Sequence, residues 1–229
     1  MDEYQSIISL LALGMGTAWA SGINLYATLL VLGLMGATGQ MTLPPDLEVL
    51  TSPIVIGAAG LMYMVEFTVD KIPGVDNGWD AIHTVIRIPA GAVLAAATMG
   101  EVGSAATVAA AIVGGGLAMG THATKAGSRV MVNTSPEPFS NFFVSVGEDI
   151  AVLLGLWTAL NHPLLFIILL VLFVILLIWL LPKMWSAIKK VFSFISNLFS
   201  SKSSTSDYAQ SSKDFKTKLQ LNLDKNKKS

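Results

Sequence analysis

The strongest constraint on this chain is an uninterrupted apolar run, LLFIILLVLFVILLIWLL, at residues 164–181. In helical geometry these 18 residues cover about 27 Å, close to the roughly 30 Å of a bilayer's hydrocarbon core. The run is apolar on every side, which is typical of a helix surrounded by lipid. It therefore predicts a membrane-spanning helix that faces lipid.

Similar apolar segments recur along the chain, at 22–38, 53–71, 82–99, 104–124 and 141–160. Charged residues make up 13% of the sequence, whereas a soluble domain would carry about 25%. Together with the run at 163–181, these segments predict about six membrane spans. The predicted fold class is all-α, a polytopic bundle of membrane helices over residues 1–181.

A further apolar stretch, Ile7–Ala18, precedes the first of these spans. One straight helix over Ile7–Thr38 would be about 48 Å long, which exceeds a hydrocarbon core of about 30 Å. A break is therefore expected near Ser21–Gly22. Residues Ile7–Ala18 are expected either to lie on the membrane surface or to re-enter the membrane.

Small residues recur at three- and four-residue steps in the spans at 82–99 and 104–124. With one methionine they form two stripes, Gly91, Ala95 and Met99, and Gly103, Ala106, Ala110, Gly114 and Ala118. Stripes of this kind let helices approach closely in lipid. We therefore interpret them as packing faces.

The distribution of charge predicts an orientation in the membrane. With six crossings, both termini and the loops at 72–81 and 126–139 share one side. All 14 Lys and Arg residues fall on that side or in the adjoining helix ends. The opposite side carries Asp46, Glu48 and Glu101 and no basic residue. The positive-inside rule then places both termini in the cytoplasm.

The character of the chain changes after Pro182. Apolar residues then recur with helical spacing, at Trp185, Ile188, Phe192, Ile195 and Phe199. This pattern predicts an amphipathic helix at 182–199 that lies on the inner membrane surface. Residues 200–229 are rich in Ser, with seven Lys against three Asp, which is typical of a disordered tail. The tail either attracts anionic lipid or keeps the chain soluble.

Charge within the membrane domain is concentrated in two helical hairpins. Of the 16 charged residues before residue 182, 11 lie in Glu66–Arg87 or Lys125–Asp149. Each segment is interpreted as a helix toward the cytoplasm, a polar loop with proline, and a returning helix. Leaving such groups in lipid costs roughly 2.5–3.5 kcal/mol each on insertion scales. We therefore expect them to face one another and to line a polar cavity that opens to the cytoplasm.

The side chains expected in this cavity come from five of the predicted spans and from residues next to them. They are Asn24, Glu66, Asp70, Asp80, His83, Arg87, His122, Lys125, Glu148 and Asp149. Glu66 and Glu148 are the predicted carriers of a proton or cation, and His83 is the predicted relay. Arg87 and Lys125 are interpreted as counter-charges or anion clamps. Residues nearer the loops are expected to be solvated at the interface, namely Lys71, Asp76, Arg129 and Glu137.

Three functions fit these residues. The hairpins contain three more acidic than basic residues, and buried carboxylates near a histidine can exchange protons. The leading hypothesis is a membrane transporter or permease for a small solute or ion, with proton coupling. The first alternative is a structural or scaffolding protein whose buried charges only fix helix packing. The second is a magnesium-dependent enzyme acting on a phosphorylated lipid, with the metal on Asp76, Asp80, Glu148 and Asp149.

Other binding chemistry has little support in the sequence. The chain has no cysteine, which excludes disulfides and thiolate ligands. The spacing of His83 and His122 matches no zinc motif, so no metal or cofactor is expected. The basic residues lie in the hairpins or in the tail, which argues against nucleic-acid binding. The expected partners are membrane lipid, the small solute or ion, and a second copy of the chain.

Several polar motifs carry a family resemblance. They are SGINLYATLLVLGL at 21–34, LPPDLEVL at 43–50, VEFTVDKIPGVDNGWDAIHT at 65–84, RIPAG at 87–91, KAGSRVMVNTSPEPFSN at 125–141 and the pair Glu148–Asp149. In this order they resemble a bacterial integral-membrane family catalogued as domain of unknown function 4126. The resemblance covers most of residues 10–181 and implies a small multi-pass protein of the inner (cytoplasmic) membrane. It specifies no substrate, and residues after Pro182 look like an extension outside the family pattern.

Overall fold

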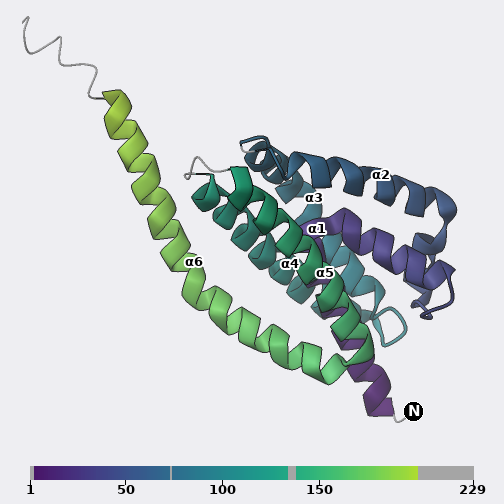
Figure 1. The fold of residues 1–229 in the computed structure, drawn as a ribbon. Coiled ribbons are helices and arrows are strands. Elements are labelled where there is room, and N and C mark those ends of the chain that lie inside the picture. The colour runs from purple at the N-terminus through teal and green to yellow at the C-terminus, as the bar shows by residue number, and fades with distance from the viewer. Residues whose placement is uncertain (1–2, 73, 134–137, 201–229) are drawn as a thin grey trace, which may run out of the picture. The chain divides into compact units, whose positions relative to one another are not determined.

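The computed structural model describes residues 3–72, 74–133 and 138–200, and every regular element in these ranges is a helix (Figure 1). The elements are α1 (Glu3–Ala37), the short 3-10 helix η1 (Pro45–Thr51), α2 (Pro53–Val69), α3 (Val75–Ala97), α4 (Ser104–Val132), α5 (Pro138–Asn161) and α6 (Pro163–Ser200). The chain divides into two compact units, residues 1–185 and 186–229. The predicted all-α fold class is confirmed.

The helices have the length and composition of membrane spans. Five are long and apolar enough to cross a bilayer, and η1 with α2, which meet at a bend of 69°, form a sixth candidate. The chain is thus a multi-pass membrane protein. In Pro163–Lys183, only 6% of the most apolar 18-residue stretch is buried within the structure. This is what was predicted for a helix that faces lipid.

Helix α1 is broken at Asn24, whose backbone has the non-helical angles φ −145° and ψ 98°. The Asn24 side chain causes and caps this break, because its Oδ1 accepts a hydrogen bond from the Ala27 backbone N–H at 2.9 Å. The break lies two residues after the predicted position at Ser21–Gly22. It divides α1 into a first arm, residues 3–23, and a second arm, residues 25–37.

Both ends of α1 lie at the same end of the first unit, which corrects the predicted path of the chain. Ser6 and Ser9 line a cavity of about 540 Å³ together with Gln40, Glu101 and Asn161. The latter residues lie at the ends of α1, α3 and α5 (Figure 1). The start of α1 therefore lies at the end of the bundle without basic residues, because the chain turns back at Asn24. The prediction had placed this start of the chain at the end with the basic residues, and for the first arm of α1 the structure shows the opposite end.

The first arm of α1 forms the centre of the bundle. Ala12, Thr17 and Ala18 are fully buried. Of the two predicted placements of Ile7–Ala18, the one on the membrane surface is therefore excluded. Gly22 approaches α4 so closely that a Cβ atom there would lie 2.5 Å from the Ala118 carbonyl oxygen. Small residues thus set the spacing between the central helices.

The two predicted small-residue stripes lie at this packed centre. Gly91 and Ala95 of α3, Met99 just after α3, and Ala110, Gly114 and Ala118 of α4 are buried. A Cβ atom on Gly114 would lie 3.0 Å from the Gly91 carbonyl oxygen. The interpretation as packing faces is confirmed for these six residues, whereas Gly103 and Ala106 at the start of the second stripe are only half-buried.

The charged segments are more helical than predicted. Helix α3 begins at Val75 rather than near residue 82, and α4 continues to Val132 rather than ending near residue 124. Hydropathy falls at the charged residues, but the helices continue because those side chains find partners within the bundle. Helix α6 likewise continues through Pro182, where a separate amphipathic helix was predicted to begin. The predicted disordered tail at 200–229 lies, apart from Ser200, outside the described residues.

Candidate functional site

Charged side chains from α2, α3, α4 and α5, with Asp70 just after α2, meet in one largely buried cluster. This charged network consists of three basic residues, Arg87, Lys125 and Arg129, and six acidic residues, Glu66, Asp70, Asp76, Asp80, Glu148 and Asp149. Among the described residues, nine ion pairs with N–O distances of 2.5–3.8 Å connect all of these except Asp149. Asp149 joins through Asn24, whose Nδ2 donates to Asp149 Oδ1 at 3.0 Å. The two predicted hairpins therefore do meet inside the bundle.

Arg87 of α3 links two of the acidic residues. Its Nη2 donates to Glu66 Oε1 at 2.5 Å and its Nη1 donates to Asp80 Oδ1 at 3.0 Å. The Arg87 side chain is fully buried, as is Glu66. A buried guanidinium that holds two carboxylates is costly to remove, because both acceptors are then left uncompensated.

Lys125 and Arg129 lie one turn apart on the same face of α4. Lys125 Nζ donates to Asp70 Oδ2 at 2.8 Å, to Glu66 Oε1 at 3.3 Å and to the Ile23 carbonyl oxygen at 3.1 Å. Arg129 Nη2 and Nε donate to the two oxygens of Glu148 at 2.5 and 3.3 Å. The prediction that Arg129 is solvated is wrong, since its side chain is fully buried.

Asp76 was also predicted to be solvated, and it too is fully buried. It accepts hydrogen bonds from Asn133 Nδ2 at 2.9 and 3.0 Å and from the Gly74 backbone N–H at 2.8 Å. Asn133 is absent from the predicted site. Its one sequence signal is its position, one turn after Arg129 on the same face of α4. Asn141 of α5 completes this corner, with its Nδ2 3.4 Å from Asp76 Oδ2.

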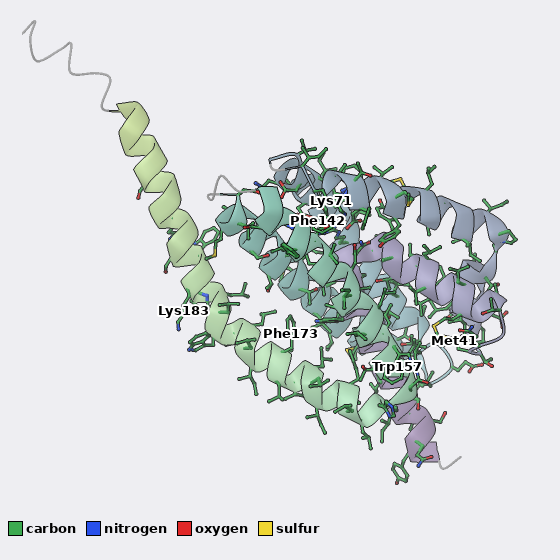
Figure 2. The ribbon with its side chains drawn as sticks, in the orientation of Figure 1. Met41, Lys71, Phe142, Trp157, Phe173 and Lys183 are labelled. Carbon is green, nitrogen blue, oxygen red and sulfur yellow. The ribbon has the colours of Figure 1, made fainter. Side chains whose placement is uncertain are left out.

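Lys71 lies outside the membrane-spanning segments, at the end of α2. Its Nζ donates to the Phe67 carbonyl oxygen at 2.8 Å and lies 2.9 Å from the Phe67 ring centroid. Phe142 of α5 lies beside it (Figure 2), with a ring centroid 5.8 Å away. Burial lowers the pKa of the Lys71 ammonium, while the Asp149 carboxylate opposes this shift. Glu137, the other predicted loop residue, lies outside the described side chains.

The two predicted histidines have different surroundings. His122 Nδ1 lies 3.1 Å from Arg87 Nη1, and its Nε2 lies 2.8 Å from Thr84 Oγ1. His83 bonds to the Tyr26 hydroxyl at 3.1 Å and to the Trp79 carbonyl oxygen at 2.9 Å. His122 is therefore the histidine that contacts the charged network, whereas the predicted relay, His83, lies beside it.

The charged network is short of positive charge and of hydrogen-bond donors. It holds six carboxylates and three basic side chains within the bundle. The Lys71 ammonium, just after α2, adds a fourth positive charge near Asp149 and Asp70, so the carboxylates still outnumber the basic groups. Three carboxylate oxygens are buried without a hydrogen-bond partner among the described protein atoms, namely Glu66 Oε2, Asp70 Oδ1 and Asp80 Oδ2. Among the network's hydrogen-bond donors, only Arg87 Nε is buried without a partner among the described protein atoms. Its unmet requirement is therefore for a proton, a cation or another donor.

The helices that carry this network correspond to a known protein family. A family model described as a domain of unknown function (DUF4126) matches residues 11–183. The chain belongs to this family. No curated protein and no solved structure matches the chain. The DUF4126 region contains the whole charged network and ends at Lys183, so the residues after Lys183 lie outside the family match.

The predicted polar cavity is replaced by a filled cluster within the DUF4126 region. Opposite charges that converge pair with one another rather than line an open space. A cavity of about 290 Å³ instead lies beside the network, between α4 and α5. Lys125 and Glu148 line it together with apolar residues such as Ile23, Val144 and Phe173.

The predicted magnesium ligands do not form one site. Among the residues that the structure describes, no group of three His, Asp or Glu side chains is placed to hold a metal ion. Asp76 bonds to asparagines, Asp80 to Arg87, Glu148 to Arg129 and Asp149 to Asn24. Each carboxylate thus has its own protein partner.

Proposed function

We propose that this protein is a membrane transporter or permease for a small solute or ion and that its charged network carries a coupled proton. The observation that supports this most is the excess of six carboxylates over three basic groups at a site where burial is costly. Uncompensated charge in a membrane bundle is rare and usually serves an ion or proton pathway. Binding a proton or a cation would remove the excess.

The break in α1 provides a second support. Asn24 and the Ile23 carbonyl group lie at this break, and both bond to members of the charged network, Asp149 and Lys125. Transporters place irregular backbone at their binding sites, where it can respond to bound charge. A change of charge in the network would thus act directly on the two arms of α1.

The contacts assign a role to each principal residue. Glu66 is the proposed proton carrier, because its Oε2 is buried and unpartnered beside Arg87 and Lys125. Glu148 is the proposed point of access, since its side chain is 15% exposed. Arg87 and Lys125 act as counter-charges, and His122 replaces His83 as the histidine in contact with them.

The proposal includes a location and an orientation. The basic residues of the first unit lie at the end of the bundle that carries the charged network, with one exception. The exception, Lys183, lies at the end of the last candidate span. The positive-inside rule then places that end in the cytoplasm of a bacterial inner membrane, with the C-terminal segment on the same side. The start of α1 lies at the opposite face.

Proton movement across liposomes tests this function. Purified protein is reconstituted into vesicles that contain a pH-sensitive dye. A pH gradient is imposed with and without a membrane potential, and with and without candidate small solutes and ions, because a coupled proton moves only together with its solute. We expect flux above that of protein-free vesicles. Glu66→Gln should reduce this flux by at least about tenfold, which corresponds to a transport barrier raised by roughly 1.4 kcal/mol. The matched control is Glu101→Gln, which removes an exposed carboxylate far from the network.

A wild-type flux no greater than that of protein-free vesicles would contradict the proposal. It would favour a second candidate, a structural membrane protein, which the nine ion pairs among four helices support. In that case Glu66→Gln would change the free energy of unfolding, and no variant of the charged network would change any flux. Circular dichroism and elution volume in detergent establish in both cases that the variants are folded.

A further inference from the structure

The cavity between α4 and α5 is the site beside the charged network that a ligand can enter. Its volume of about 290 Å³ is close to the lower limit of about 300 Å³ for small-molecule sites. Ile23, Val144, Ala151 and Phe173 give it apolar walls. Phe173 extends from α6 toward the bundle (Figure 2).

The carboxylate of Glu148 is the charged group that this cavity offers to a ligand. Its side chain is 15% exposed, whereas the Lys125 side chain is only 2% exposed. Lys125 Nζ already donates to three oxygens, which uses its three N–H donors. Both Glu148 oxygens already accept a hydrogen bond from Arg129, but each carboxylate oxygen has a second lone pair. A ligand in the cavity therefore meets a carboxylate with remaining acceptor capacity and no available charged donor.

The hydroxyl groups that line the cavity have the same bias. Thr124 Oγ1 donates to the Gly120 carbonyl oxygen at 2.9 Å, and Ser128 Oγ donates to the Lys125 carbonyl oxygen at 2.7 Å. Thr121 Oγ1 likewise lies 3.1 Å from the carbonyl oxygens of Leu117 and Ala118. Since each hydroxyl proton is engaged within α4, these oxygens are left as acceptors. The cavity is lined mostly by apolar atoms, and the few polar atoms that it exposes are acceptors. It thus suits a mostly apolar ligand with one hydrogen-bond donor group.

The geometry points to a binding site for a small primary ammonium ion with an apolar body. The ammonium group would pair with Glu148, and the body would contact Ile23, Val144 and Phe173. The size of the cavity limits the body to about one ring or a short alkyl chain. This inference rests on the proposed transport function and names the class of solute that it would carry.

Binding of three isosteric probes tests the site. Purified full-length protein in lipid nanodiscs is titrated with radiolabelled 2-phenylethylammonium. Neutral 2-phenylethanol and anionic 3-phenylpropionate serve as competitors. We expect saturable binding of the cation that unlabelled cation displaces and that the other two probes do not. Glu148→Gln should weaken this binding by at least about tenfold, equivalent to roughly 1.4 kcal/mol.

A second variant separates loss of the site from loss of the fold. A Cβ atom on Gly147 meets no atom within 4 Å, so Gly147→Leu should fold and partly fill the cavity that Gly147 lines. It should weaken cation binding at least as strongly as Glu148→Gln. Gly57→Leu makes the same change in open space on α2 and should leave binding unchanged.

Two outcomes would overturn the inference. Equal displacement by 2-phenylethanol would show a site for apolar groups such as lipid acyl chains. Absence of saturable cation binding, while the Glu66-sensitive proton flux persists, would refute the ammonium site and leave the transport function intact. Selective cation binding without any flux would instead support the site and contradict the transport function.

Discussion

Replacing Arg87 with methionine is expected to lower the free energy of unfolding by about 3–5 kcal/mol. Methionine keeps most of the length of the side chain but removes the donors to Glu66 and Asp80. Both carboxylates would remain buried with no compensating charge from α3. Unfolding in mixed micelles at increasing denaturing detergent, followed by circular dichroism, measures the loss.

Two comparisons make this prediction specific. The double variant Arg87→Met, Glu66→Met removes a whole ion pair and should recover part of the stability, because one unpaired charge disappears with its partner. Lys183→Met removes an exposed basic residue whose ammonium lies 3.1 Å from the Trp179 ring centroid, and it should lower stability by no more than about 1 kcal/mol. If Arg87→Met were as stable as Lys183→Met, the charged network would not be buried as the structure shows.

Gly22→Leu is expected to disrupt the contact between the first arm of α1 and α4. A Cβ atom at Gly22 would overlap the Thr121 hydroxyl and would lie 2.5 Å from the Ala118 carbonyl oxygen. Backbone cannot move as a flexible side chain can, so the two helices must separate. Overpacking of this kind costs about 1–3 kcal/mol and occasionally more, and we expect the upper end of this range.

The same unfolding assay tests Gly22→Leu against a matched variant. Gly57→Leu places an identical side chain where nothing lies within 4 Å, and it should be close to the wild type in stability. Because Lys125 bonds to Ile23 next to Gly22, Gly22→Leu should also displace the end of the first arm from the charged network. Equal stabilities of the two leucine variants would contradict the close approach of α1 and α4.

The membrane spans could be predicted because their signal is local. An apolar run of sufficient length suffices for a span, and α5 and α6 begin within a few residues of the predicted positions. The path of α1 could not be predicted in the same way. Its turn depends on one side chain, Asn24, that bonds to Ala27 in its own helix and to Asp149 in α5. The second of these contacts exists only in the folded bundle.

The sequence predicts which residues belong to the site better than it predicts which of them pair with each other. The cost of charge in lipid requires the side chains of the two hairpins to converge, and they do. Which side chains pair depends on the register of the helices and on how far α3 and α4 extend. Hydropathy reports neither of these. Arg129 and Asp76 were therefore placed at the interface although both are buried, and Asn133 was missed. For the same reason a filled network replaces the predicted open cavity.

The central claim is that the charged network holds a carboxyl proton that it can exchange. Infrared difference spectroscopy of the protein in membranes, between acidic and alkaline buffer and in light and heavy water, tests this most directly. We expect a protonated-carboxyl band that changes with pH, shifts in heavy water and is lost in Glu66→Gln. If no such band occurred at any pH at which the protein stays folded, all six carboxylates would be ionised, and the network could not carry a proton.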